Sequence, residues 1–171
     1  MKGFPPEIPL GNDLGTNGYP LLESVRVEPG IPSDIPGYDY PTSGSNPEPE
    51  TCLALIDTGA DTCSITANLK GKLDLLPQKG KISEGGYAGQ TRDLDAYSIL
   101  ITLGGVFSCL VRVAAVMVPK KGYNYQIIIG CNVLQHCTLT YGTHSGEDRN
   151  FTLHVPRAMG MVLTAAGSMS A

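Results

Sequence analysis

The chain has few charged residues and no cluster of one sign. Charged side chains make up 16% of its 171 residues, and the formal net charge is −4. The one pair of adjacent basic residues, Lys120-Lys121, precedes a glycine and has the composition of a turn. Because electrostatic binding of nucleic acids or anionic membranes needs a basic surface, we expect neither a nucleic-acid nor a membrane partner.

The chain also lacks paired cysteines. Its five cysteines are an odd number, and no two of them form a C-x-x-C pair. Several lie in apolar runs, where a free thiol packs as a small hydrophobic side chain. Cys131, His136 and Cys137 lie close together in sequence, but a structural zinc site needs four ligands. We therefore expect core thiols, no metal or other cofactor, and a reducing compartment.

The sequence shows neither the pattern of a secretory signal peptide nor that of a membrane-spanning helix. The first residues, MKGFPPEIPLG, are interrupted by prolines, so we expect no secretion through a signal peptide. The longest apolar run spans residues 99–118, contains Gly104-Gly105 and is rich in β-branched residues. This run predicts two buried strands joined at a glycine turn rather than a membrane helix.

Long amphipathic helices and internal repeats are missing as well. No helical period persists for more than about two turns, so the core is predicted to be mainly β. Strands are expected at residues 19–27, 51–57 and 62–69, whereas residues 70–81 have the composition of a loop, and a short helix is expected after Gly130. Short strands separated by glycine turns are typical of a small barrel or sandwich.

One acidic residue stands at the end of an apolar strand, in LALIDTGADTCSI at residues 53–65. A turn aspartate that caps backbone N–H groups is the simpler explanation of Asp57. A carboxylate beside a buried strand costs free energy unless it is partnered, however, and Gly59 permits close backbone approach. A glycine-rich hairpin candidate, ISEGGYAGQ at 82–90, and an apolar run ending in glycine, QIIIG at 126–130, follow in order. This ordered set is far more specific than any one of its parts.

These segments resemble the retroviral aspartic proteases, or retropepsins. LIDTGAD resembles their active-site segment, ISEGGYAGQ their flap, IIIGCNVL the segment leading into their single helix, and CTLTY the C-terminal strand of their dimer interface. The resemblance implies a mainly β protein with a closed β-barrel of the acid-protease fold, one short C-terminal helix, and activity as a homodimer. Aspartic proteases need two carboxylates that share one proton. Since the chain has a single D-T-G, the second carboxylate is expected from a second copy.

The resemblance also implies roles for individual residues. Asp57 is expected to be the catalytic acid and base that activates a water molecule, and Thr58 and Gly59 complete the active-site loop, with Thr58 hydrogen-bonded between subunits. The substrate is expected to be an extended polypeptide that lies between the flap and the floor of the site. The residues expected to contact it are Leu55, Gly59, Ala60, Asp61, Gly85, Gly86, Tyr87 and Ile128.

The sequence departs from the family pattern next to the helix. Retropepsins usually have an arginine where this chain has Cys131, whereas Asn132 fits the pattern. That arginine normally pairs with the acid equivalent to Asp61 and stiffens the dimer. Here Asp61 needs another partner, such as Arg92 or Arg112, or it stays solvated.

Composition and the resemblance together suggest three parts. Residues 1–50 hold ten of the thirteen prolines. We expect a flexible N-terminal extension at 1–18, a protease domain at 19–141 with a Pro-rich insert loop at 28–50, and a C-terminal extension at 142–171. The last part is expected to be either an added interface strand or a precursor remnant.

The sequence therefore predicts an aspartic endopeptidase that cleaves extended segments of a viral or retroelement polyprotein. An intracellular or virion-associated location is expected. The alternative is a catalytically weak or inactive retropepsin-like module that serves in dimerisation or peptide binding. An intact D-T-G favours the enzyme, because a module without catalysis has no need for a carboxylate at this position.

Overall fold

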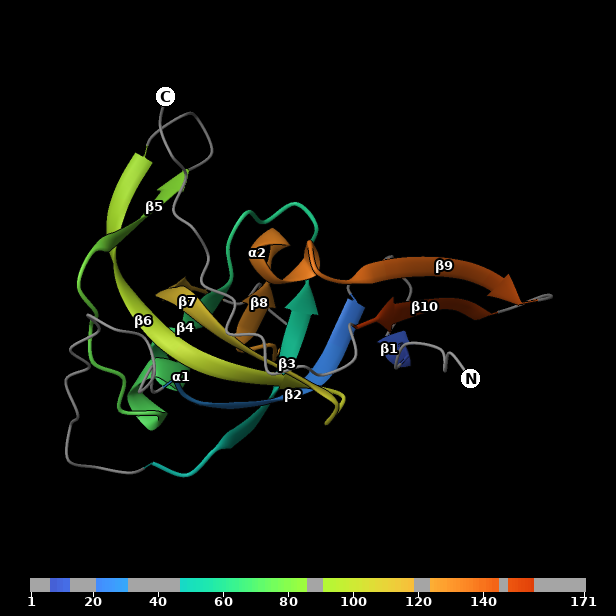
Figure 1. Ribbon diagram of the computed structural model, residues 1–171, viewed down its shortest axis with the longest axis horizontal. Coiled ribbons are helices and arrows are strands. Elements are labelled where there is room, and N and C mark those ends of the chain that lie inside the picture. The colour runs from blue at the N-terminus through green and yellow to red at the C-terminus, as the bar shows by residue number, and fades with distance from the viewer. Residues whose placement is uncertain are drawn as a thin grey trace.

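The computed structural model describes residues 7–12, 21–30, 47–85, 91–118, 124–144 and 148–155. These residues form ten strands and two short helices, so the protein is mainly β, as predicted (Figure 1). The elements are β1 (Glu7–Asn12), β2 (Leu21–Pro29), β3 (Glu50–Ile56), β4 (Ser64–Thr66), α1 (Ala67–Lys72), β5 (Lys81–Gly85), β6 (Thr91–Leu103), β7 (Phe107–Met117), β8 (Ile127–Ile129), α2 (Cys131–Leu134), β9 (Thr138–His144) and β10 (Asp148–His154). No helix in the described residues is long and apolar enough to cross a membrane.

Six strands close into a barrel. Their order around the ring is β2-β3-β8-β4-β7-β6, and β6 pairs back onto β2 to complete it. The pairs β3–β8 and β4–β7 are parallel, and the others are antiparallel. The predicted closed β-barrel is therefore confirmed.

Alternating side chains fill the barrel. In β3 the residues Cys52, Ala54 and Ile56 are buried, whereas the residues between them are exposed or half-buried. Since neighbouring side chains of a strand point to opposite faces, one face of each strand supplies the core. The largest fully buried side chains are Val25, Val27, Ile65, Leu69, Leu73, Ile99, Ile101, Leu103, Val113, Ile127, Ile129 and Leu153.

Two predictions about local structure had different outcomes. The glycine turn is confirmed, because β6 and β7 form a hairpin in which Gly104 and Gly105 adopt positive φ values of 53° and 67°. The strand expected at residues 62–69 is wrong in its second half, where α1 begins. Thr66 Oγ1 accepts a hydrogen bond from the Leu69 N–H at 3.1 Å, so Thr66 caps this helix.

The remaining strands extend from the barrel in two directions. β5 pairs with the first half of β6, and this hairpin projects from the barrel at the upper left of Figure 1. On the other side, β1 pairs with β2 and β10, and β10 pairs with β9. Residues 7–12 of the expected flexible N-terminal extension thus form a sheet strand, and part of the C-terminal extension supplies another. Residues 31–46 of the Pro-rich insert lie outside the described residues.

Candidate active site

The predicted active-site segment lies where two parallel strands end together. β3 ends at Ile56, and the Asp57 N–H donates to the Ile129 carbonyl at the end of β8 over 3.1 Å. Because parallel neighbours end at the same edge of the sheet, the loop after β3 meets the turn that leads from β8 into α2. Asp57 is therefore anchored through its backbone to the barrel, while its side chain is partly exposed.

The carboxylate of Asp57 is oriented by its own loop. The Gly59 N–H donates to Asp57 Oδ1 at 2.8 Å, and the Ala60 N–H donates to the Asp57 carbonyl at 3.3 Å. A Cβ atom added to Gly59 would lie 3.2 Å from the same carboxylate oxygen, which is closer than most real contacts of this kind. A backbone N–H bonded to an anionic carboxylate is a strong, orienting hydrogen bond, so this turn holds Asp57 in one direction.

The start of α2 is hydrogen-bonded to the active-site loop. The Cys131 N–H donates to the Ala60 carbonyl at 2.7 Å, and the Asn132 N–H donates to the Asp61 carbonyl at 3.0 Å. Cys131 Sγ lies 3.3 Å from the Thr58 carbonyl and donates to it. The thiol that stands at the family's arginine position thus contacts the backbone of the active-site loop.

Gly130 makes this close contact possible. A Cβ atom at this position would lie 2.6 Å from the Thr62 carbonyl oxygen and 2.8 Å from that of Ala60. Both neighbours are backbone atoms, which cannot rotate away as a side chain does. Only glycine therefore allows the turn after β8 to lie directly against the loop.

The predicted substrate residues fall into three groups. Leu55 and Ile128 are paired in register between β3 and β8, and both are half-buried on the outer face of the barrel. Gly59 and Asp61 are exposed and Ala60 is partly exposed, beside the exposed Thr58 of the same loop. Gly85 is the last residue of β5, whereas Gly86 and Tyr87 lie outside the described residues. The structure brings the first two groups together at one end of the barrel, and their contact with a substrate stays a prediction.

Neither of the two arginines considered as partners of Asp61 forms an ion pair with it among the described residues. Arg112 Nη2 donates to the Lys79 carbonyl at 3.4 Å, so this guanidinium is engaged at the loop before β5. Arg92 is exposed on β6. Within the described residues the carboxylate of Asp61 has no ion pair, and the residue is exposed.

The five cysteines are free thiols, and their surroundings differ. Cys137 Sγ faces the Val133 carbonyl at 3.8 Å, and Cys131 Sγ faces that of Thr58. The described residues contain no group of three or more His, Cys, Asp or Glu side chains arranged to hold a metal ion.

Sequence reasoning missed one contributor, Cys63. Its N–H and its thiol both lie near Asn132 Oδ1, at 3.0 and 2.9 Å. In the sequence this cysteine is indistinguishable from a packing residue, because it sits beside an apolar segment like the others. Only its place directly after the D-T-G loop gave any signal.

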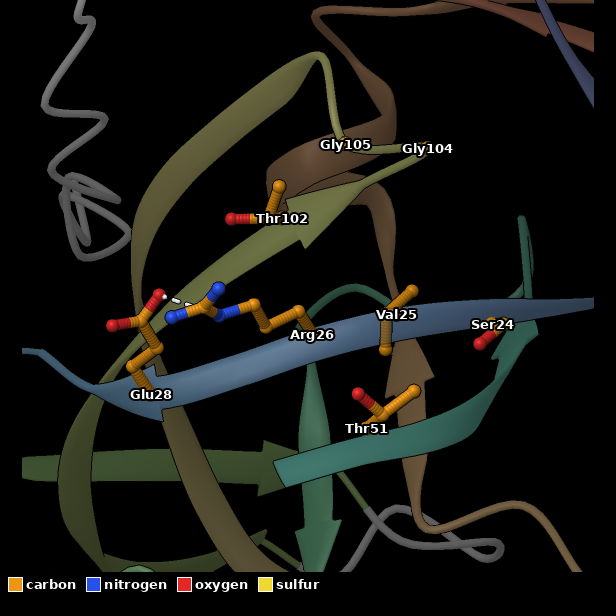
Figure 2. A pocket seen from close by; sticks show the side chains of 8 residues that line it. All are labelled: Ser24, Val25, Arg26, Glu28, Thr51, Thr102, Gly104 and Gly105. Carbon is orange, nitrogen blue, oxygen red and sulfur yellow. Dashed lines mark ion pairs between the residues drawn. The ribbon is translucent and has the colours of Figure 1, made fainter. Parts of the chain in front are cut away.

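A separate open hollow lies at the other end of β3. Figure 2 shows its lining, which includes the ion pair of Arg26 and Glu28, joined at 3.1 Å, and the Gly104-Gly105 turn. Its volume is about 460 Å³. Thr51 lines it at the start of β3, whereas Asp57 follows the end of that strand, so the two regions are roughly 20 Å apart along the strand. The hollow is therefore not part of the candidate active site.

Comparison with known proteins supports the fold. A solved structure of a retropepsin-like aspartic protease from Rickettsia conorii superimposes with a TM-score of 0.50 over 90% of this chain and 94% of that chain, at 12% sequence identity. No family model matches the sequence, and no curated protein matches it either. At this identity the likeness concerns the fold alone. The protein has the retropepsin-like aspartic protease fold.

The buried thiols generate a prediction about stability at high pH. Burial raises the pKa values of Cys63 and Cys109 from 9.0 to about 12. A raised pKa stabilises the folded state fully below pH 9, and this contribution is lost as the pH rises towards 12. Under reducing conditions, urea unfolding should show a free energy of unfolding that falls across this range. Cys109→Val should reduce the slope by on the order of 1 kcal/mol per pH unit. An unchanged slope in Cys109→Val would contradict the raised pKa of the Cys109 thiol.

Proposed function

We propose that the protein is an aspartic endopeptidase that acts on extended peptide segments. The observation that carries the proposal is the oriented carboxylate of Asp57, held by the Gly59 N–H on a partly exposed loop. The retropepsin-like barrel supports it, because this loop and the β5–β6 hairpin extend from the same body. A turn aspartate with a purely structural role would not need a second segment, at Cys131 and Asn132, whose backbone N–H groups bond to the loop.

The chemistry requires a second carboxylate. In peptide hydrolysis one carboxylate removes a proton from water while the other donates its proton to the carbonyl oxygen of the substrate. Water oxygen bonds to the carbonyl carbon, and the tetrahedral intermediate then breaks its C–N bond as the amine nitrogen takes up a proton. The chain supplies one such loop, so the other Asp57 comes from a second copy related by a two-fold axis. Since the pair must hold one proton, cleavage should be fastest at mildly acidic to near-neutral pH.

The substrate would bind as an added strand. An extended peptide between the loop and the β5–β6 hairpin alternates its side chains, which reach pockets on either side. Leu55 and Ile128 form an adjoining apolar pair beside the loop. We therefore expect a preference for apolar side chains next to the cleaved bond. A polyprotein substrate and an intracellular or virion-associated location remain proposals that rest on the resemblance to retropepsins.

The edge of β9 is the surface that we propose for dimerisation. Within the described residues β9 pairs only with β10, and Figure 1 shows β9 on the side of β10 nearer to α2. Natural proteins protect free edges with charged residues or proline. The sequence of β9, TLTYGTH, contains no lysine, acidic residue or proline, whereas the other edge strand, β5, contains Lys81 and Glu84. An antiparallel pair of β9 strands across a two-fold axis is self-complementary, and it would join the two subunits close to their loops.

Replacement of Asp57 tests the proposed catalysis. Asp57→Asn should lower the rate of peptide cleavage by at least about a hundredfold, because general acid–base catalysis contributes roughly 10² to 10⁴. Cleavage of a library of extended peptides near pH 5 to 6 measures this. Asp74→Asn is the matched control, since Asp74 lies in an exposed turn with φ of 45°, a conformation that asparagine also adopts.

Two results would speak against the enzyme. Full activity of Asp57→Asn would remove Asp57 from the mechanism. A folded wild-type chain that cleaves nothing at any concentration would favour the alternative, a retropepsin-like module for dimerisation or peptide binding.

A substitution at the edge of β9 tests the proposed dimer. Thr138→Lys adds a charge to the exposed start of β9 and should raise the dimer dissociation constant at least about tenfold, as edge lysines oppose strand pairing. Sedimentation over a concentration series measures it. Thr51→Lys should leave the dissociation constant unchanged, because Thr51 is exposed on β3, a barrel strand that lies between two neighbouring strands. Equal dimerisation of both variants would exclude the β9 edge.

A further inference from the structure

Cys63 stands at the joint between the active-site loop and the turn after β8. Its side chain is completely buried, with no exposed surface. Its thiol donates to Asn132 Oδ1 at 2.9 Å and accepts from the Gly130 N–H at 3.3 Å. One sulfur atom thus acts as donor and acceptor between two residues of the opposing segment.

The two groups bonded to the Cys63 thiol, the Gly130 N–H and Asn132 Oδ1, have few other hydrogen-bond partners. In the described part of the chain the Gly130 N–H has no other acceptor than this sulfur atom. Asn132 Oδ1 accepts from both the N–H and the thiol of Cys63. Leaving a buried donor such as the Gly130 N–H unpaired destabilises the folded state. The position of the turn at Gly130 therefore depends on the hydrogen-bonding groups of the side chain at residue 63.

A second buried cysteine shows that burial alone does not produce this arrangement. Cys109 on β7 is 1% exposed, nearly the same as Cys63. Among the described residues its thiol makes no hydrogen bond, and it packs with the apolar core. Cys109 behaves as a hydrophobic side chain, whereas Cys63 behaves as a polar link.

We propose that Cys63 is a positioning residue for Asp57, an inference that rests on the proposed protease function. The thiol holds the turn at Gly130 and Asn132 against the loop, and the bonds from Asp57 to Ile129 and from Cys131 to Ala60 depend on that alignment. A catalytic group displaced by about 1 Å can lose on the order of a hundredfold in rate. Cys63 touches no reacting atom and acts through the position of the loop.

Four variants separate a polar link from simple packing. Cys63→Ser keeps a donor and an acceptor, whereas Cys63→Val keeps the bulk and removes both. Peptide cleavage by Cys63→Val should show kcat lowered at least about tenfold with KM within about twofold, and Cys63→Ser should retain kcat within about threefold. Cys109→Val and Cys109→Ser are the matched controls, and both should keep wild-type kcat, although Cys109→Ser should unfold at lower urea concentration because it buries a hydroxyl.

Amide hydrogen exchange of Gly130, measured by NMR, gives a readout that does not require activity. Its protection should fall at least about tenfold in Cys63→Val and persist in Cys63→Ser and in Cys109→Val. Wild-type kcat together with wild-type protection in Cys63→Val would overturn the proposal. If the wild-type chain proves inactive, the proposed function fails separately, and the exchange result alone then decides whether Cys63 holds the loop.

Discussion

The structure depends on the joint between the loop at residues 57–63 and the turn that joins β8 to α2. Parallel pairing of β3 and β8 brings both segments to one edge of the barrel, and backbone hydrogen bonds at Ala60 and Asp61 then fasten them. Gly130 allows an approach that any side chain would block. The joint therefore fixes the loop that carries Asp57, whose partly exposed carboxylate accepts from the Gly59 N–H.

In the function proposed for this chain, the joint supplies half of a catalytic centre. Asp57 is directed by the Gly59 amide towards an exposed side of the loop, where the chain offers no second D-T-G. Under the proposed function, two-fold symmetry would supply the second loop, because a second copy of the chain carries the same Asp57. β9 follows α2 in the chain and forms the uncharged edge of the three-stranded sheet of β1, β10 and β9. The proposed contact between subunits is therefore separated from the joint by only a few residues.

Much of the barrel was predictable from local patterns. Apolar segments marked β3 and β8, and Gly104-Gly105 marked the hairpin between β6 and β7. The helix α1 was missed because it is six residues long and carries only one buried side chain, Leu69, so no helical period develops. The partners of β1 and β10 depend on pairing between the two ends of the chain, which no local signal encodes. The motif marked Asp57 as a candidate site residue. The hydrogen bonds of Cys63 could not be predicted, because a hydrogen-bonding thiol and a packing thiol have the same sequence signature.

The central claim is that two copies of Asp57 form one catalytic centre. The most direct test mixes wild-type chains with Asp57→Asn chains at constant total concentration, allows subunits to exchange, and measures peptide cleavage against the fraction of wild type. If each centre needs both carboxylates, an equal mixture should retain about a quarter of the wild-type rate, because only that share of random dimers carries two intact loops. A rate of about one half, falling in proportion to the wild-type fraction, would show that each chain works alone and would contradict the account.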